Sequence, residues 1–262
     1  PRRPPANKPD CTVVGMIVDT DYQREMLAWK TTVTPTSSPE LLERLLDLTW
    51  PGIRRARLGE WVLRAGNNHS GRANSVLACG DPGVPFAEAE RLAEAWAGRR
   101  MQLQVVAGSQ EQRLAEAEGY VVTQPNPIVV MVADARISRG PESAAASAPD
   151  VGWRRISSRS SDAFLAESAA APACYLRLGD DAVGRVAIAH GWGVLTGIEV
   201  RSEARRRGLG RAITRALMTE ATRRGAGFIA LQVEERNTVA RALYDSEGFE
   251  THHRYAYLAR GR

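Results

Sequence analysis

The chain has 262 residues, of which 44% are hydrophobic and 25% are charged. This composition is typical of a globular protein with one large core or two modest ones, and it excludes disorder over most of the chain. The formal net charge is +5, and only Lys8 and Lys30 among the 35 basic residues are lysines. From residue 151 onward, 18 arginines face 12 acidic residues. We therefore expect an anion to bind in the C-terminal half.

Cysteine spacing and hydropathy argue against further classes of protein. Cys11, Cys79 and Cys174 lie far apart without a CxxC spacing, so we expect neither a disulfide framework nor a zinc or other metal site. No apolar run approaches the roughly 18 residues that span a membrane, and the start of the chain has no apolar signal-peptide core. We expect a cytoplasmic protein that does not enter a membrane.

The first half of the chain predicts a small appendage and one α/β unit. In residues 1–35 a single strand-like run, 12–18, suggests a small β appendage, which we expect to be incomplete because the chain does not begin with methionine. The unit that follows covers residues 36–137. Apolar spacing predicts its helices at 38–48, 86–99 and 110–117, and its strands at 60–65, 73–78, 101–106 and 127–132.

Residues 138–150 read as a linker, because their small residues and prolines show no apolar periodicity. A second unit, residues 151–262, follows. Its strands are expected at 152–156, 173–178, 184–190, 193–200, 228–234 and 251–258. Its helices are expected at 161–169, at about 209–224 before a left-handed stop at Gly225, and from a cap at Asn237 to Gly248.

The two units repeat each other in sequence. Leu103-Gln104-Val105 matches Leu231-Gln232-Val233 at an offset of 128 residues, and Glu118-Gly119-Tyr120 matches Glu247-Gly248-Phe249 at an offset of 129. Similar helix endings precede both strands. The same elements in the same order and spacing predict a duplicated fold.

The sharpest motif is the segment RRRGLGRA at residues 205–212, which lies between a predicted strand and a predicted helix. Gly208 and Gly210 let the backbone curl closely around an anion, while the free amides and the dipole of the helix start attract it. A Walker loop would need GxxxxGK[ST], and a dinucleotide fingerprint would need Gly or Ala at Ile213. We predict a diphosphate cradle; the alternative is an exposed basic turn that opens an ordinary helix.

The segment resembles the R/Q-x-x-G-x-G/A loop of GCN5-related N-acetyltransferases (GNAT), matched by Arg205, Gly208 and Gly210. The flanking residues follow in the order of that family: Ile198-Glu199-Val200 before the loop, then Leu231-Gln232-Val233, Asn237, Ala240, Leu243-Tyr244 and Gly248-Phe249. The resemblance covers residues 151–262 and implies an acetyl-CoA-binding catalytic domain there.

The first unit resembles the degenerate N-terminal half of tandem acetyltransferases from actinobacteria, through residues 59–80 (GEWVLRAGNNHSGRANSVLACG). It has no RxxGxG segment, so we do not expect it to bind a second acyl-CoA. The implied fold is α/β: two tandem GNAT-like units, each a mixed, mostly antiparallel sheet flanked by helices.

The resemblance also implies roles for single residues. The backbone amides of residues 206–211 would hold the diphosphate, and the strand backbone at Ile198 and Val200 would pair with pantetheine. Tyr244 would protonate the leaving thiolate, and Asn237 would cap its helix and touch the cofactor. The expected cofactor-binding residues are Ile198, Val200, Arg205, Arg206, Arg207, Gly208, Leu209, Gly210, Arg211, Asn237 and Tyr244.

The general base departs from the pattern of relatives. In ribosomal-protein N-terminal acetyltransferases a Glu occupies the position of Gln232, and a Gln cannot accept the ammonium proton. Glu234 shares a strand face with Gln232, and Glu199 lies beside the acyl end. Either carboxylate could act as the base through a water molecule, or bulk water could take the proton. The alternative is that both glutamates are solvated strand residues without a catalytic role.

The sequence therefore predicts an N-acyltransferase that moves an acetyl group from acetyl-CoA to a primary amine of a small molecule or a protein. Direct attack is expected, in a cleft between the units, because no residue is a convincing nucleophile. A non-catalytic acyl-CoA sensor or scaffold is the alternative, whereas a nucleic-acid binder would need aromatic residues among the arginines. For residues 71–74 we favour a local turn network over the lining of a groove.

Overall fold

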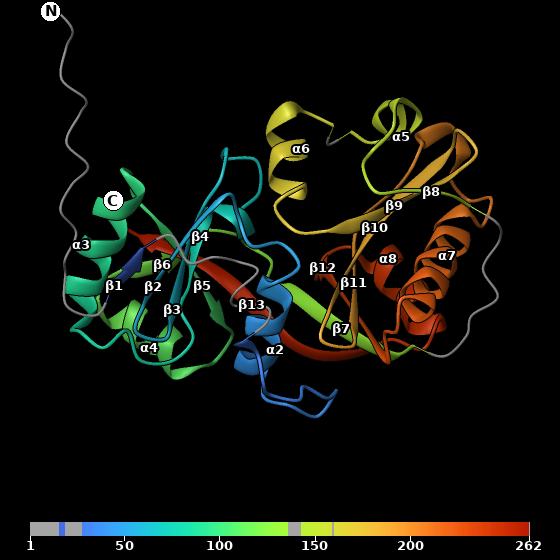
Figure 1. The fold of residues 1–262 in the computed structure, drawn as a ribbon. Helices are drawn as coiled ribbons and strands as arrows, with labels where there is room; N and C mark the ends of the chain where they lie inside the picture. Colours follow the sequence, from blue (N-terminus) through green and yellow to red (C-terminus); the bar gives the residue numbers. More distant parts are fainter. Residues whose placement is uncertain (1–15, 19–27, 136–142, 159, 262) are drawn as a thin grey trace, which may run out of the picture.

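The computed structural model describes residues 16–18, 28–135, 143–158 and 160–261 of the chain. Within these ranges thirteen strands form one continuous sheet, and the helices pack against it in two lobes (Figure 1). Neighbouring strands are antiparallel except in two pairs, β4 with β5 and β11 with β12. The predicted α/β class, mixed and mostly antiparallel, is confirmed, but the strands of both halves form one sheet and not a separate sheet in each unit.

The strands are β1 (Met16–Val18), β2 (Arg54–Leu58), β3 (Trp61–Ala65), β4 (Ser75–Leu77), β5 (Gln102–Val106), β6 (Tyr120–Val122), β7 (Ile128–Asp134), β8 (Ala144–Ala146), β9 (Ala173–Leu178), β10 (Ala182–Ala189), β11 (Trp192–Val200), β12 (Phe228–Glu234) and β13 (Glu250–Arg260). The helices are α2 (Pro39–Asp47), α3 (Phe86–Ala97), α4 (Gln110–Ala117), α5 (Val151–Ile156), α6 (Asp162–Ser168), α7 (Leu209–Arg223) and α8 (Thr238–Ser246). Two short 3-10 turns cover Arg72–Asn74 and Ser202–Ala204.

The order of strands joins the two halves of the chain. It runs β1-β2-β3-β4-β5-β13-β7-β12-β11-β10-β9-β8, with β6 attached beside β13. The last strand of the chain, β13, therefore lies between β5 and β7, while β7 pairs with β12. Figure 1 shows both long strands running between the lobes. Because each half gives a strand to the other, main-chain hydrogen bonds hold the halves together.

Strands β11 and β12 pair over a short stretch and then diverge. Their register runs from Trp192 opposite Phe228 to Leu195 opposite Leu231. Beyond that point β11 stays with β10 and β12 stays with β7. A bulge in β11 accompanies the divergence, with Gly197 at a φ of +61°. Among the residues that the structure describes, the edge of β11 that faces β12 therefore has no strand partner from residue 196 to residue 200.

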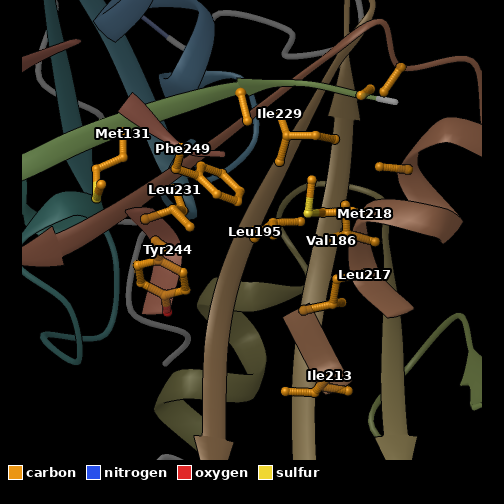
Figure 2. Close-up of a cluster of buried hydrophobic side chains, with 14 of the residues drawn as sticks. Met131, Val186, Leu195, Ile213, Leu217, Met218, Ile229, Leu231, Tyr244 and Phe249 are labelled. Atoms are coloured by element: carbon orange, nitrogen blue, oxygen red, sulfur yellow. The ribbon is translucent and has the colours of Figure 1, made fainter. Parts of the chain in front are cut away.

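Helix α7 packs across this part of the sheet. Its buried face includes Ile213, Leu217 and Ala221, as the sequence predicts. The helix lies close because Gly184 has no side chain: a Cβ there would come within 2.6 Å of Leu217 Cδ1. Figure 2 shows the resulting apolar cluster, which extends to Tyr244. The core thus fixes the start of α7 relative to β11.

Two predictions around the linker are wrong. Residues 152–156 belong to helix α5 and not to a strand, because Asp150 caps that helix by accepting a hydrogen bond from Trp153 N at 2.6 Å. The linker is not wholly irregular either, since Ala144–Ala146 pairs with β9 as edge strand β8. Residues 138–142 lie outside the described residues.

Other differences are smaller. Strands β2 and β6 have no counterpart in the prediction, since Arg54–Leu58 is rich in arginine and Tyr120–Val122 is short. Of the strand-like run 12–18, Met16–Val18 pairs with β2 at the edge of the sheet, and the rest of it lies outside the described residues. No helix in the described ranges is long and apolar enough to cross a bilayer.

Candidate active site

The loop between β11 and α7 is a concave run of free backbone amides. Arg206 and Gly208 both have left-handed backbones, with φ of +61° and +79°. Gly208 is the N-cap of α7 and offers no side chain to the helix start. Within the described residues, the six N–H groups of 206–211 donate no hydrogen bond. Such a run of amides, together with the dipole of a 15-residue helix, attracts anions.

Exposed arginines surround these amides. Arg205, Arg206, Arg207 and Arg211 are all exposed. Arg205 Nε donates to the carbonyl of Val200 at 3.3 Å, and Arg211 pairs at 2.8 Å with Glu247, the C-cap of α8. These two contacts hold the flanks of the loop, while Arg206 forms no ion pair with any residue that the structure describes. The loop is thus positively charged where its amides are free.

Helix α8 packs against the start of α7. A Cβ on Gly210 would lie 3.2 Å from Leu243 Cδ1, so the close approach favours glycine at this position. Asn237 is the N-cap of α8, and its Oδ1 accepts a hydrogen bond from Ala240 N at 3.2 Å. The structure therefore places Asn237 at the helix cap.

Tyr244 lies on the buried face of α8. Its ring packs against Phe249 at a centroid distance of 5.8 Å, and Figure 2 shows its hydroxyl turned away from Phe249 and Leu231. Burial raises the pKa of Tyr244 to about 12. The hydroxyl therefore stays protonated at neutral pH and can donate a proton.

A cavity of about 440 Å³ lies beside the diverging strands, between the two halves of the chain. Its lining comes from β11, β12 and β13 together with segments of the first half and helix α6. The residues used below are Trp50, Ser70, Gly71, Arg72, Phe164, Gln232, Glu234, Tyr255 and Tyr257. The local turn network predicted for residues 71–74 is present, since Asn74 Nδ2 donates to Ser70 O at 2.8 Å and Ala73 N donates to Ser70 Oγ at 3.2 Å. The alternative role is seen as well, because Gly71 and Arg72 line this cavity.

Helix α6 holds the wall that carries Arg72. The buried carboxylate of Glu167 accepts hydrogen bonds from His69 N at 3.1 Å, from Ser70 N at 3.0 Å and from Asn74 Nδ2 at 2.8 Å. A side chain on Gly66 would collide with this carboxylate, since its Cβ would lie 2.6 Å from Glu167 Oε1. One residue of the second half thus fixes the cavity-lining loop of the first.

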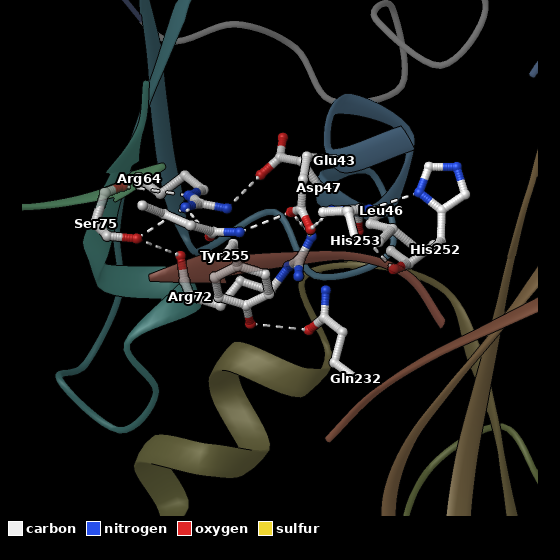
Figure 3. Close-up of polar contacts among 12 residues, drawn as sticks. Glu43, Leu46, Asp47, Arg64, Arg72, Ser75, Gln232, His252, His253 and Tyr255 are labelled. Atoms are coloured by element: carbon white, nitrogen blue, oxygen red, sulfur yellow. Dashed lines mark hydrogen bonds and ion pairs between the residues drawn. The ribbon is translucent and has the colours of Figure 1, made fainter. Parts of the chain in front are cut away.

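Behind this wall lies a buried network of charges (Figure 3). Asp47 pairs with Arg55 and, at 3.1 Å, with Arg64. Glu43 lies 3.4 Å from Arg72 Nη2. Burial by itself would raise the pKa of both carboxyl groups, but the neighbouring arginines hold each pKa below its ordinary value. Both acids are therefore ionised at neutral pH.

The carboxylates predicted as bases lie in different surroundings. Glu234 reaches the cavity, where its exposed side chain pairs with Arg236 at 2.6 Å. Glu199 accepts a hydrogen bond from Ser158 N at 2.9 Å and does not line the cavity. Glu234 therefore lines the same cavity as Gln232, whereas Glu199 lies outside it. Tyr244 does not line the cavity either.

Trp50 and Tyr255 are among the cavity residues that the sequence did not single out, and Arg72 was considered there only as the less favoured alternative. Arg72 and Trp50 belong to the half without a phosphate-binding motif, and Tyr255 lies on the strand that crosses between halves. A usable signal was the string Gly71-Arg72-Ala73-Asn74, whose contact with the other half depends on tertiary structure.

The chain was compared with known protein families, curated proteins and solved structures. A family model described as "Probable histone acetyltransferase Rv0428c C-terminal" matches residues 36–258. A search of curated proteins finds no match. Among solved structures, the chain is similar to a GCN5-related N-acetyltransferase from Kribbella flavida, with a TM-score of 0.61 and 19% identity over 87% of this chain and 97% of that one.

Two further structures share the fold. An acetyltransferase of the GNAT family from Colwellia psychrerythraea has a TM-score of 0.54 at 9% identity, over 94% of this chain and 99% of that one. A tandem GNAT protein from the clavulanic acid biosynthesis pathway has a TM-score of 0.52 at 16% identity, over 70% of this chain and 72% of that one. At these identities the likeness concerns the fold alone.

Proposed function

The chain belongs to the family described as the C-terminal region of a probable histone acetyltransferase, and from this premise we propose that it transfers an acetyl group from acetyl-CoA to a primary amine. The observation that carries the proposal is the run of six free N–H groups at residues 206–211 among exposed arginines. A diphosphate offers the anionic oxygens that such a loop lacks. The residues present therefore fit coenzyme A.

The unpaired edge of β11 suits the next part of the cofactor. Between residues 196 and 200 the strand keeps β10 on one side and has no partner on the other. The strand backbone at Ile198 and Val200 can pair with the amides of pantetheine as a strand would, and the carbonyl of Val200 also accepts a hydrogen bond from Arg205 Nε at 3.3 Å. Bound acetyl-CoA supplies an activated thioester, which the protein must hold beside the amine.

Two different residues of the chain serve the two proton transfers of the reaction. Tyr244, whose hydroxyl is protonated at neutral pH, gives a proton to the leaving thiolate. The amine enters through the cavity, where Glu234 can accept its proton through a water molecule. Glu199 and bulk water are the other candidates for the base. We propose direct attack by the amine, without an acyl-enzyme.

We also propose that the chain consists of two GNAT-like units, 36–137 and 151–262, with residues 138–150 between them and residues 1–35 as an appendage. In each unit an antiparallel series of strands leads to a parallel pair, β4 with β5 and β11 with β12. A helix connects the two strands of each pair, α3 in the first unit and α7 in the second. The similarity to a tandem GNAT protein supports the same division.

Release of free thiol from acetyl-CoA tests the proposal. The protein is incubated with acetyl-CoA and a panel of primary amines, and calorimetry measures the affinity for CoA separately. We expect CoA to bind at one site per chain and at least one amine to accelerate thiol release. Binding without turnover on any amine would contradict transfer and indicate an acyl-CoA sensor; no binding would reject the loop as a cofactor site.

A further inference from the structure

The cavity wall carries hydrogen-bond donors that the chain leaves without acceptors. Arg72 is 92% buried, and within the described residues its Nε and Nη1 atoms have no hydrogen-bond partner. The same holds for the amide Nε2 of Gln232. Both residues line the cavity, and Figure 3 shows the amide nitrogen of Gln232 turned toward the guanidinium of Arg72. A buried donor without an acceptor costs free energy, so we expect an acceptor between these two side chains.

The neighbouring side chains do not supply enough acceptors for these donors. Gln232 Oε1 accepts the hydroxyl hydrogen of Tyr255 at 3.3 Å, which orients the amide. If the amide were turned by half a rotation, its oxygen could accept one N–H group of Arg72. The Nε and Nη1 atoms carry three N–H groups between them, so others would still lack an acceptor.

The first half of the chain shows what occupies the matching position. Gln104 stands in the same Leu-Gln-Val string as Gln232, at the repeat offset of 128 residues. Its Oε1 accepts from Arg64 Nη2 at 2.8 Å, and its Nε2 donates to the carboxylate of Glu43 at 2.7 Å. That carboxylate also faces Arg72, at 3.4 Å. A glutamine amide and an arginine thus share a carboxylate in the first half, whereas in the second half the glutamine faces a cavity.

The charge balance favours an anion at this point. The buried network next to the cavity has three arginines, Arg55, Arg64 and Arg72, against two ionised carboxylates, Glu43 and Asp47. On the side of the second half, buried Arg185 and buried Glu167 contribute one charge of each sign. A buried net positive charge beside a cavity is stabilised by an anionic ligand.

We propose that the amine acceptor carries a carboxylate, which binds Arg72 and Gln232 in the cavity while its amine points toward the diverging strands. The inference rests on the proposed acyl transfer and names the class of acceptor: a small amino acid-like molecule whose amine and carboxylate are separated by a few bonds. The cavity volume of about 440 Å³ suits such a ligand, and the aromatic rings of Trp50, Phe164 and Tyr257 can cover its apolar part. A lysine in a basic peptide tail would bring positive charge toward Arg72 and is disfavoured.

Matched probes test the charge requirement. The ω-amino acids from 3-aminopropanoate to 6-aminohexanoate are compared with their primary amides, which have the same length and no charge. Thiol release gives kcat/KM for each probe, and calorimetry in the presence of CoA gives its affinity. For at least one chain length we expect the acid to be preferred over the amide by about 10- to 100-fold, as charge-assisted hydrogen bonds predict.

Variants assign the preference to the two residues. Gln232→Glu places a carboxylate of the chain opposite Arg72, so we expect it to remove the preference for acids or reverse it. Gln232→Met, of similar length and without a donor, should weaken the preference, and Arg72→Gln should abolish it. Arg100→Gln removes an exposed arginine of the same half, outside the cavity, and should leave the preference unchanged. If Arg72→Gln does not fold, the two Gln232 variants decide.

The outcomes separate this inference from acyl transfer itself. Turnover with equal rates for acids and amides, or a preference that survives in both Arg72→Gln and Gln232→Glu, would overturn the carboxylate site and leave the transferase intact. Binding of the acids that depends on Arg72, without turnover of any amine, would support the site and reject transfer. Tighter binding of 3-aminopropylphosphonate than of any carboxylate, or a lysine-rich peptide as the best acceptor, would overturn the proposed class.

Discussion

The loop between β4 and α3 and the loop between β11 and α7 both connect a strand to a helix, yet their backbone amides have opposite environments. In the first loop Gly80 N donates to Glu111 at 2.8 Å, and Asp81 N donates to Glu60 at the same distance. In the second loop the N–H groups of residues 206–211 donate to no described residue, and arginines surround them. The first loop supplies its own anions, whereas the second can take one from a ligand.

The same contrast holds for the charged side chains of the two halves. Arg55 and Arg64 of the first half are buried against Asp47, where they have structural partners and little contact with solvent. Arg205 and Arg206 of the second half are exposed beside the free amides. The net charge of each half therefore says little about ligands until each arginine is placed in the structure. The exposed arginines beside the free amides lie in the second half, whereas Arg55 and Arg64 of the first half are occupied by Asp47.

Removing the acid from the buried network should have the largest effect. Asp47→Asn leaves Arg55 and Arg64 buried without their anion, so we expect a loss of about 3–5 kcal/mol in the free energy of unfolding. Asp181→Asn is the matched control, because Asp181 pairs with exposed Arg207 at 3.6 Å. This substitution should lower the free energy of unfolding by less than about 1 kcal/mol. Urea denaturation measures both. Equal losses would contradict the structural role of the buried charges.

Acid should weaken the same network. The folded-state pKa values of Glu43 and Asp47 lie below their ordinary values of 4.5 and 3.8. Their contribution to stability is therefore complete above those ordinary values and is lost as the pH falls below them. Unfolding curves between pH 7 and pH 3 should show a steep loss at the acidic end, and Asp47→Asn should flatten it. A variant with the wild-type pH dependence would remove Asp47 from this explanation.

Loss of cofactor binding is the next expected effect. Gly210→Asp adds a side chain where a Cβ lies 3.2 Å from Leu243 Cδ1, and it adds a negative charge among the free amides. We expect the affinity for CoA to fall at least about 100-fold, which is roughly 2.7 kcal/mol. Ala87→Asp introduces the same side chain at the second position of α3, the corresponding place in the first half, and should leave CoA affinity unchanged. Calorimetry measures the CoA affinity of both variants. Equal affinities would contradict the prediction that only the loop between β11 and α7 binds CoA.

The sequence predicted most elements because their signals are local. Strand β12 occupies the predicted residues 228–234, and α7 begins at Leu209 as expected, since glycines and apolar spacing mark both. Residues 152–156 were misread as a strand because the cap from Asp150 and the burial of Trp153 decide for a helix. The exchange of β7 and β13 between the lobes depends on pairings between residues 94 to 155 positions apart, which no local pattern encodes.

The candidate site divides in the same way. The loop at residues 205–211 carries its own glycines and arginines, so its motif was visible in the sequence. The wall formed by Arg72 was not, because Glu167, almost a hundred residues away, holds the loop that bears it. The basic loop could therefore be identified from the sequence, whereas the cavity depends on how the halves meet.

A smaller effect is expected at Tyr244. In the register of the repeat its counterpart in the first half is Ala115, which has no hydroxyl. Tyr244→Phe keeps the ring among its buried neighbours and removes the proton donor, so turnover should fall by about 10- to 100-fold while CoA affinity stays nearly constant. Steady-state rates and calorimetry separate the two quantities. Unchanged turnover would remove Tyr244 as the acid, and a parallel loss of CoA affinity would indicate a binding role.

The smallest effect should come from the acids of the first loop. Glu60→Gln together with Glu111→Gln keeps acceptors for the amides of Asp81 and Gly80 and removes two negative charges. Because charged acceptors are worth more than neutral ones, we expect a loss of about 1 kcal/mol in stability. No second CoA site should appear, since the loop has no arginine cluster and its amides remain occupied. Calorimetric stoichiometry decides: one CoA per chain is expected, whereas two CoA per chain would show that the two carboxylates alone separate the halves.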